Sequence, residues 1–288
     1  MGLAPRLSVV IVNWNAGGSL LACVSSILSQ PDASGYEVIV VDNASSDGSA
    51  QTVAAVPGVR VIANAENRGL AAANNQGIVA AQGEVLLVSN PDVVYRPGAI
   101  AALVAALGRH PSAAIVVPRL RYPDGTLQTS AGDIPTLRDA VRGRRHSRRA
   151  ASTTGFWWDG WAHDEERAIG RGHEAAYVVR RAAVDDVGLQ DESFFLDWEG
   201  IDWTERMRSR GWQIWFTPTA EVVHEGGASI RQVPLRWIVR SHRGMYRYFA
   251  KRHRAYAPAL AALFGARAVV KLASAVTSDV YGRGHRGA

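Results

Sequence analysis

The chain has 288 residues, a formal net charge of +6, 47% hydrophobic residues and 20% charged residues, which are the proportions of an ordinary globular protein. Its single cysteine, Cys23, excludes an intramolecular disulfide framework and a zinc site built from several cysteines. Residues 1–6 lack the pattern of a signal peptide, and no run of about 18 uncharged apolar residues occurs, so we expect a cytoplasmic protein without a membrane-spanning helix.

The first half of the chain alternates predicted strands with predicted helices. The strand segments are continuous apolar runs, which indicates strands buried on both faces of a sheet. Helical spacing between these runs predicts right-handed crossovers and therefore an α/β fold with a mostly parallel sheet. In chain order, the expected strands are 7–13, 36–41, 59–63, 84–89 and 113–117, and the helices between them are 17–29, 48–56, 70–81 and 97–109.

Residues 121–172 interrupt this pattern. Six arginines lie within 138–149, and three tryptophans and a phenylalanine lie within 156–161. A long irregular segment inside a compact domain is usually functional or disordered. Regular elements return as strands at 175–179 and 213–216, with a helix at 201–210.

The last part of the chain has a different composition. Residues 231–288 contain twelve Lys or Arg and one acid, so this tail carries +11 and the rest of the chain −5. Aromatic residues are interleaved with the basic ones, and the apolar stretch 259–276 is interrupted by Arg267 and Lys271, which is typical of interfacial helices. We expect one domain at 1–230 and a basic amphipathic helical tail at 231–288.

The expected partner of this tail is an anionic membrane surface, which would place the protein peripherally at the inner face of the cell membrane. A charged helical lid packed on the acidic body is the alternative. Nucleic acid is not an expected partner, because no recognised binding module accompanies the charge.

Polar clusters follow two predicted strands, at the sheet edge where parallel α/β folds bind ligands. Asp42, after the second strand, can accept hydrogen bonds from a base or ribose, or it can belong to a helix cap. Asn90-Pro91-Asp92, after the fourth strand, suits a divalent cation that bridges phosphates, or an ordinary turn.

A third cluster places five acids in the twelve residues 191–202. Its apolar and aromatic neighbours can raise the pKa of a carboxylate by desolvation, as a general base requires. Downstream, His224 closes a predicted strand before a glycine turn, where it is a metal ligand or a structural histidine.

Seven segments form an ordered set that covers most of residues 7–230. They are 8–15, 40–48, 67–74, 86–92, 194–199, 211–212 and 218–224. In this order and spacing they closely resemble the family 2 glycosyltransferases of the rhamnosyltransferase-like branch. The resemblance implies an inverting enzyme with the GT-A fold, the Rossmann-like sandwich of nucleotide-diphospho-sugar transferases.

The resemblance also assigns a donor site and a metal site. Asp92 matches the last carboxylate of the family's Asp-x-Asp motif, and His224 matches the histidine that completes the site for Mn²⁺ or Mg²⁺. That cation would neutralise the leaving diphosphate. Trp14 and Asp42 would hold the base, and Asn74 would lie near the diphosphate. The implied donor-binding residues are Trp14, Asn15, Asp42, Arg68, Asn74 and Asn90.

The chain departs from the family at the catalytic base. Family members usually carry Glu-Asp followed two residues later by Asp, whereas this chain reads Glu199-Gly200 and retains Asp202. Because glycine cannot accept a proton, we predict that Glu199 is the base, with Asp202 and Asp197 as fallbacks. A catalytically silent sugar-nucleotide-binding or glycan-binding partner of another transferase is the alternative function.

The resemblance points to a UDP- or dTDP-sugar donor, with dTDP-rhamnose as the leading expectation. The expected acceptor is a glycan or a polyprenyl-linked precursor of the cell wall or of a polysaccharide. Trp157, Trp158 and Trp161 can stack on sugar faces or form core beneath the long loop. The arginine run at 138–149 can clamp an acceptor diphosphate or be a disordered, solvated loop.

Overall fold

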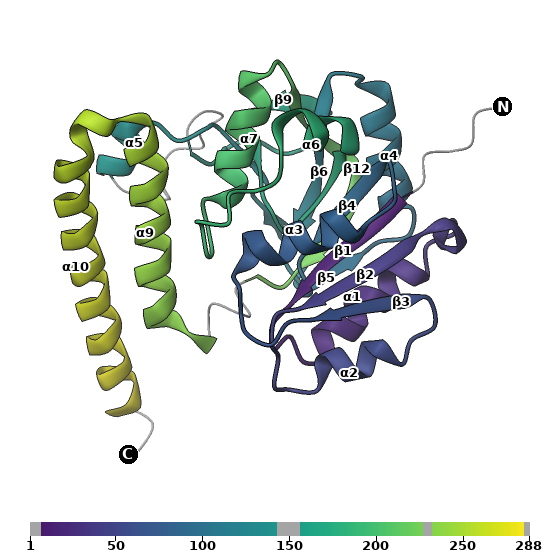
Figure 1. The fold of residues 1–288 in the computed structure, drawn as a ribbon, viewed down its shortest axis with the longest axis horizontal. Coiled ribbons are helices and arrows are strands. Elements are labelled where there is room, and N and C mark those ends of the chain that lie inside the picture. Colours follow the sequence, from purple (N-terminus) through teal and green to yellow (C-terminus); the bar gives the residue numbers. More distant parts are fainter. Residues whose placement is uncertain (1–6, 143–155, 227–231, 285–288) are drawn as a thin grey trace.

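The computed structural model describes residues 7–142, 156–226 and 232–284. Its centre is a ten-stranded sheet with the order β3-β2-β1-β4-β11-β6-β12-β5, to which β7 and β9 add at β6 and β12. Figure 1 shows this sheet between helices, with a helical hairpin at one side. The strands are β1 Leu7–Asn13, β2 Glu37–Asp42, β3 Val59–Ala63, β4 Val85–Ser89, β5 Val93–Tyr95, β6 Ala113–Arg121, β7 Leu127–Gln128, β8 Ala131–Gly132, β9 Arg167–Ile169, β10 Arg171–Gly172, β11 Ala176–Arg180 and β12 Gln213–His224.

The sheet begins as the sequence predicts, with β1 to β4 all parallel. β1 is buried along its whole length because its run of branched apolar side chains packs on both faces of the sheet. β11 then inserts antiparallel between β4 and β6, and β12 pairs parallel with β6. The carboxyl ends of β1 and β4 therefore meet the start of β11 at one edge.

Helices cover both faces of the sheet. Apolar side chains of α1, α2 and α4 join one core cluster, and those of α3, α6 and α7 join a second cluster on the other face. The sandwich is therefore the predicted α/β architecture. The helices, including the short η1 and η2, are α1 Gly18–Leu28, η1 Ala33–Gly35, α2 Ser49–Ala54, α3 Leu70–Ala80, α4 Ala99–Arg109, α5 Leu137–Arg142, α6 Arg181–Val187, α7 Glu199–Ser209, α9 Pro234–Arg252, η2 Arg254–Tyr256 and α10 Ala257–Gly284.

Two parts of the sheet differ from the sequence prediction. β12 extends to His224, well beyond the expected strand 213–216, because its second half pairs with β5 and, after a bulge, with the end of β6. The segment 121–172 also contains more order than expected. It adds β7 and β9 to the main sheet and forms a separate two-stranded sheet from β8 and β10. Part of the arginine run lies outside the described residues.

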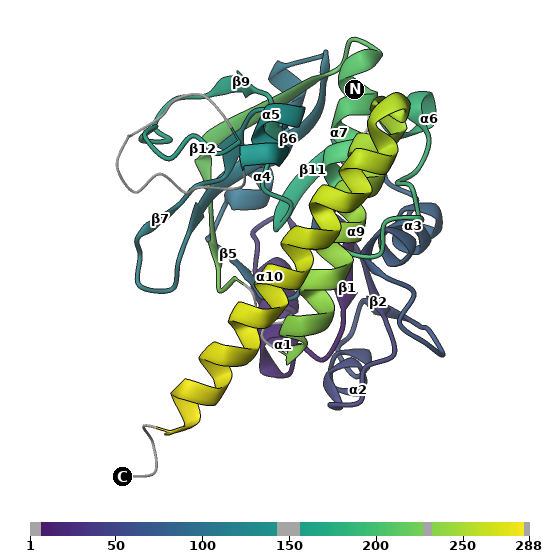
Figure 2. The same ribbon diagram turned by 90° about the vertical axis from the view of Figure 1, so that its left-hand side faces the viewer.

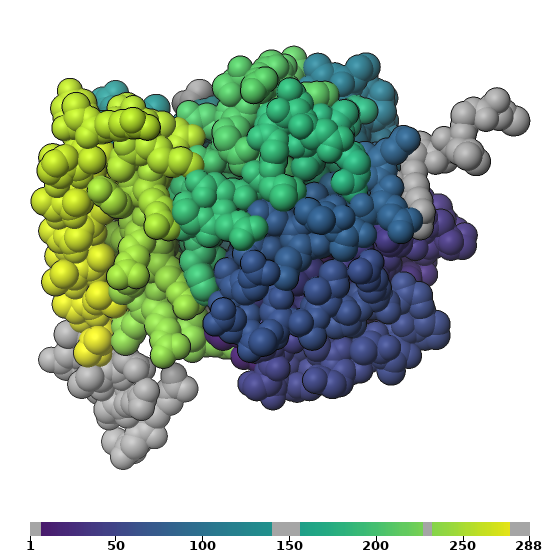
Figure 3. Space-filling view, in the orientation of Figure 1, coloured from purple at the N-terminus to yellow at the C-terminus, as the bar shows by residue number. Residues whose placement is uncertain are grey.

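The basic tail folds into a hairpin of α9 and α10 against the body (Figures 1 and 2). A third core cluster joins both tail helices to the segment that precedes α7 and to its first turn. The buried members of this third cluster are Phe194, Trp198, Ile201, Met245, Tyr248, Phe249, Leu260 and Phe264. The space-filling view shows the hairpin in direct contact with the body (Figure 3). This packing is the lid arrangement considered for the tail.

The outer helix α10 bears on the membrane expectation. Within the described residues, the segment Arg254–Val276 is long and apolar enough to cross a membrane by length and composition, and little of it is buried. The expectation that no helix of the chain could span a membrane is therefore not confirmed. Val269 and Val270 are each 65% exposed on α10.

Candidate functional site

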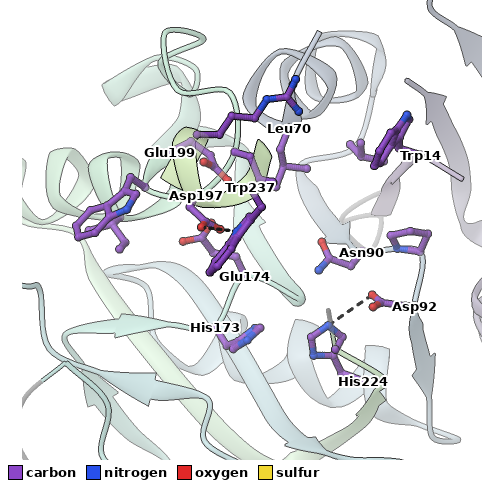
Figure 4. Close-up of a pocket in the computed structure, with 18 of the residues that line it drawn as sticks. Trp14, Leu70, Asn90, Asp92, His173, Glu174, Asp197, Glu199, His224 and Trp237 are labelled. Carbon is purple, nitrogen blue, oxygen red and sulfur yellow. Dashed lines mark hydrogen bonds and ion pairs between the residues drawn. The ribbon is translucent and has the colours of Figure 1, made fainter. Parts of the chain in front are cut away.

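A cavity of about 500 Å³ opens at the carboxyl ends of β1 and β4. The residues that follow these two strands line it, together with the loop before β11, the loop before α7, the end of β12 and one face of α9. Figure 4 shows side chains from all of these elements pointing into one space. Its volume lies within the range of about 300–1,000 Å³ that is typical of small-molecule sites.

Asp92 and His224 lie together on one wall of the cavity (Figure 4). The antiparallel register pairs His224 with Val93, which places it beside the residue that precedes β5. His224 Nε2 is 3.5 Å from Asp92 Oδ1, and both side chains are almost fully buried. Gln128 Oε1 accepts a hydrogen bond from His224 Nδ1 at 3.0 Å, which orients the ring with Nε2 toward Asp92.

This pair fits a divalent cation that shares its coordination with a ligand. Carboxylate oxygen and a neutral imidazole nitrogen are both donors for Mn²⁺, and the hydrogen bond from the far ring nitrogen fixes the ligand orientation. Within the described parts of the chain, no group of three or more His, Cys, Asp or Glu side chains is placed to hold a metal. A cation held by these two side chains would take its remaining ligands from the bound substrate or from water.

Three carboxyl groups gather across the cavity from this pair: Glu174, Asp197 and Glu199 (Figure 4). Glu199 is the most enclosed, with 1% exposure, and its Oε2 has no hydrogen-bond partner among the described residues. Burial, together with the charges of Glu174 and Asp197, raises the pKa of Glu199 well above its usual value. Glu199 therefore favours the protonated form.

The loop that carries Asp197 is strained and firmly held. Asp197 and Trp198 have φ angles of 63° and 76°, in the left-handed region that side chains with a Cβ adopt rarely. The indole of Trp237 on α9 donates a hydrogen bond to Asp197 Oδ2 at 3.0 Å. On the other side, the amide of Leu70 donates to the carbonyl of Phe195 at 2.7 Å. The tail and α3 thus hold this loop together. The side of the cavity formed by Glu174, Asp197 and Glu199 is called the carboxylate wall below.

The pattern of glycosyl transferase family 2 matches residues 8–169, more than half of the chain. The chain belongs to this family. The glycosyltransferase is 32% identical over 271 residues to the N-acetylglucosaminyl-diphospho-decaprenol L-rhamnosyltransferase of Mycobacterium tuberculosis, a match that spans 86% of this chain and 85% of that protein. The sequence prediction of the family is therefore confirmed.

Solved structures of other transferases share the fold. A mannosyltransferase from Pyrobaculum calidifontis, in complex with GDP-Man and Mn²⁺, superposes with a TM-score of 0.58 at 18% identity and covers 99% of this chain and 80% of its own. GalNAc-T7 with UDP, GalNAc and Mn²⁺ gives a TM-score of 0.56 at 19% identity, over 76% of this chain and 43% of its own. These similarities establish the GT-A fold of the glycosyltransferase.

Of the six predicted donor-site residues, two line the cavity and one lies directly beside its lining. Trp14 and Asn90 line the cavity. Asp42 is buried, and its carboxylate accepts hydrogen bonds from Asn13 Nδ2 at 2.7 Å and from the amide of Ser45 at 3.1 Å. Its own partners thus hold Asp42 at the end of β2, beside the cavity lining.

The other three predicted donor residues have partners outside the cavity lining. Asn15 accepts a hydrogen bond from a backbone amide of the turn before α2. Arg68 forms a loose, exposed ion pair with Glu192 at 3.8 Å. Asn74 is buried on α3 and donates to Gln190 at 3.1 Å. These contacts join neighbouring loops, and none of the three side chains lines the cavity.

Asp202, predicted as a second catalytic carboxylate, lies outside the cavity lining. Its side chain is 2% exposed and faces three cations. Arg206 lies 3.1 Å away on the same helix, and Lys251 and Arg252 of α9 lie 3.3 and 3.4 Å away. This setting favours a role in holding α9 on α7 over a role in proton transfer.

The three tryptophans predicted to bind the acceptor are also divided. Trp157 lines the cavity and stacks on His173, with ring centroids 5.6 Å apart. Trp158 and Trp161 are 6% and 7% exposed and belong to the core on one face of the sheet. They are core residues because the segment 156–161 folds back onto the sheet. Stacking on a sugar from these two positions is not compatible with that burial.

Sequence reasoning missed several residues of the cavity. Glu174 stands alone before β11, in a stretch without any acidic motif, so only the fold brings it to the carboxylate wall. Trp237 and Arg240 belong to the tail, whose aromatic and basic residues were interpreted as membrane contacts. Arg240 instead lies over the ring of Phe195 at 3.6 Å, at the cavity edge.

Proposed function

We propose that the protein transfers a sugar from a UDP- or dTDP-sugar, with dTDP-rhamnose as the leading donor, to a glycan or polyprenyl-linked acceptor, with inversion at the anomeric carbon. One observation carries the proposal: a buried Asp92–His224 pair and a group of carboxylates face each other across one cavity. The first suits a diphosphate and its cation, and the second suits an acceptor hydroxyl. The decaprenol-linked rhamnosyltransferase relative supports the substrate classes.

The donor would lie along the β1 and β4 ends. Trp14 offers an aromatic face for the base, and Asn90 offers an amide beside the phosphates. Asp92 and His224 would hold Mn²⁺ or Mg²⁺, which supplies positive charge to the leaving diphosphate when bound. With the diphosphate on that wall, the sugar is directed toward the carboxylates opposite.

The acceptor hydroxyl would enter on the carboxylate wall. A carboxylate that removes its proton as it attacks from the face opposite the diphosphate is the one base that inversion needs. The sequence assigns this role to Glu199, with Asp202 and Asp197 as fallbacks, and of these Glu199 and Asp197 line the cavity. Trp157, which lines the same cavity, would stack on the acceptor sugar.

For the tail, we propose peripheral membrane attachment through α10. Lys251 and Arg252 of α9 already pair with carboxylates of the body, so α9 has fewer free charges for lipid than its composition suggests. α10 keeps exposed apolar side chains at Val269, Val270 and Val276. Such a surface can enter the headgroup region, and nearby basic residues add about 1 kcal/mol each on anionic lipid.

A non-catalytic binding partner of another transferase remains the second candidate, because Gly200 stands where the family carries its base. The two functions differ in one measurable step. The enzyme releases nucleoside diphosphate from its donor, whereas the binding partner holds the donor without turnover.

The test is a donor screen with Mn²⁺ across UDP-, dTDP- and GDP-sugars, with water and with polyprenyl-diphosphate-linked N-acetylglucosamine as acceptors. We expect one donor to release its nucleoside diphosphate with the wild type, and Asp92→Asn to lose that release. Asp124→Asn is the control, because this exposed turn carboxylate lies outside the cavity. Donor binding without release, under every acceptor condition, would instead establish the binding-partner function.

A further inference from the structure

Gly200 and Glu174 occupy one shared space in the cavity wall. A Cβ built on Gly200 would lie 2.1 Å from the carboxyl carbon of Glu174 and 2.4 Å from each of its oxygens. Real Cβ atoms do not approach other atoms so closely. The carboxyl group of Glu174 therefore fills the volume that any side chain at position 200 would need.

We propose that Glu174 is the base that deprotonates the acceptor, and that the enclosed carboxyl group of Glu199 beside it does not perform this step. This inference rests on the proposed transferase function and changes the residue that performs its proton transfer. A carboxylate is present at the position where the family carries its base, but it reaches that position from the loop before β11 instead of from α7.

The backbone holds Glu174 close to the donor end of the cavity. The adjacent carbonyl, that of Ala175, accepts a hydrogen bond from the amide of Asn90 at 2.8 Å. The first residue of β11, Ala176, pairs with Ser89 at the end of β4. Glu174 is thus tied to the chain segment that carries the predicted phosphate and metal residues, where the anomeric carbon must also lie.

Accessibility separates Glu174 from Glu199. Glu174 is half-buried and faces the cavity, whereas Glu199 is almost completely enclosed. An enclosed carboxyl with one oxygen lacking a hydrogen bond is disfavoured as an anion, and the raised pKa of Glu199 agrees with this. A protonated Glu199 cannot accept the acceptor's proton.

The remaining rival on this wall is Asp197. It also lines the cavity, but the indole of Trp237 already donates to its Oδ2. That contact ties Asp197 to the docking of α9.

The reaction step is balanced without any further reagent. The acceptor O–H bond breaks and its proton passes to the Glu174 carboxylate. The oxygen forms a bond to the anomeric carbon while the bond from that carbon to the phosphate oxygen breaks. The bonding electron pair leaves with the nucleoside diphosphate, and Glu174 returns its proton to solvent.

The test removes the carboxylate at position 174 and restores one at position 200. The probe is the donor that wild type turns over in the screen, with Mn²⁺ and with water as acceptor, and the readouts are kcat, KM and melting temperature. We expect Glu174→Gln to lower kcat by about 10²–10⁴-fold, with KM for the donor nearly unchanged. Glu174→Ala should be equally slow. The double variant Glu174→Ala with Gly200→Asp should recover at least tenfold, because the deletion frees the space that the new side chain needs.

Two controls make the result specific. Glu174→Ala with Gly200→Ala fills the same space without a carboxylate and should recover nothing. Recovery in both double variants alike would show a packing role and overturn the assignment. A kcat for Glu174→Gln near that of wild type, with loss in Glu199→Gln or Asp197→Asn, would also overturn it while leaving the transferase function intact. A wild type that releases no donor at all would remove the proposed function and the base assignment together.

Discussion

Replacement of Asp202 by Asn tests how the tail is held on the catalytic body. The Asp202 carboxylate is 2% exposed and lies 3.1–3.4 Å from Arg206, Lys251 and Arg252. Asparagine keeps the shape of the side chain and removes its charge, so three cations lose their shared partner. We expect α9 to dock less firmly on α7.

The expected magnitude follows from the exposure of the partners. Breaking a fully buried pair by removal of one partner costs about 3–5 kcal/mol, because the other charge stays uncompensated. Here the cations are 31%, 46% and 23% exposed, so water can rehydrate them. We therefore expect a loss of about 2 kcal/mol. In a chain of 288 residues, that corresponds to a melting temperature lower by about 3 °C.

The assay is thermal unfolding, with hydrogen exchange of the α9 amides as a local readout. Glu165→Gln is the matched control, because it removes a carboxylate from an exposed ion pair with Arg167, and it should change stability by less than about 0.5 kcal/mol. The reasoning would be refuted if Asp202→Asn were as stable as this control and its α9 amides exchanged as in wild type, while kcat fell more than about 100-fold. Asp202 would then act on the substrate and not on the tail.

Three further predictions concern docking, acid and metal. Gly244→Ala should weaken the docking of α9 and the binding of the donor, because the added Cβ would lie 2.9 Å from the Trp198 ring. Melting temperature and KM for the donor measure the two effects, and unchanged values of both would contradict the close packing. Burial opposes the charged form of Asp191, but hydrogen bonds from Lys251 and Ser193 lower its pKa to about 2, below the unfolded value of about 3.9. The charged carboxylate therefore stabilises the folded protein above about pH 4, and this contribution should fade toward about pH 2. The stability difference between wild type and Asp191→Asn should shrink over that window, and a constant difference would exclude the linkage. His224→Gln should raise the Mn²⁺ concentration needed for half-maximal activity at least about tenfold, and an unchanged requirement would remove His224 from the metal site.

The order of strands and helices between residues 7 and 121 could be predicted because its signals are local. Continuous branched apolar runs give β1, β2 and β4, and glycine-rich turns separate them from the helices. β5 escaped prediction because three residues carry too little pattern. The second half of β12 was missed because Pro218 and polar residues interrupt its apolar run, and only pairing with β5 and β6 keeps it extended.

The proximity of Asp92 and His224 could also be predicted, since the family resemblance places both in one site and they lie next to strand ends that the fold brings together. The carboxylate wall could be predicted only in part. Glu199 follows from a motif, but Glu174 carries no local signal and reaches Gly200 only because the fold brings the loop before β11 beside the first turn of α7. The packing of the tail could be predicted only in part for a similar reason: aromatic residues such as Tyr248 and Phe249 suit both a lipid interface and the core cluster that they join.

The most direct test of the central claim is anomalous scattering at the manganese edge from crystals soaked with Mn²⁺ and a nucleoside diphosphate. We predict one strong peak within coordination distance of Asp92 and His224, next to the diphosphate, with the base toward Trp14 and open space toward Glu174. Nucleotide bound in the cavity with manganese elsewhere, or with its diphosphate on the carboxylate wall, would contradict the proposed donor and metal site.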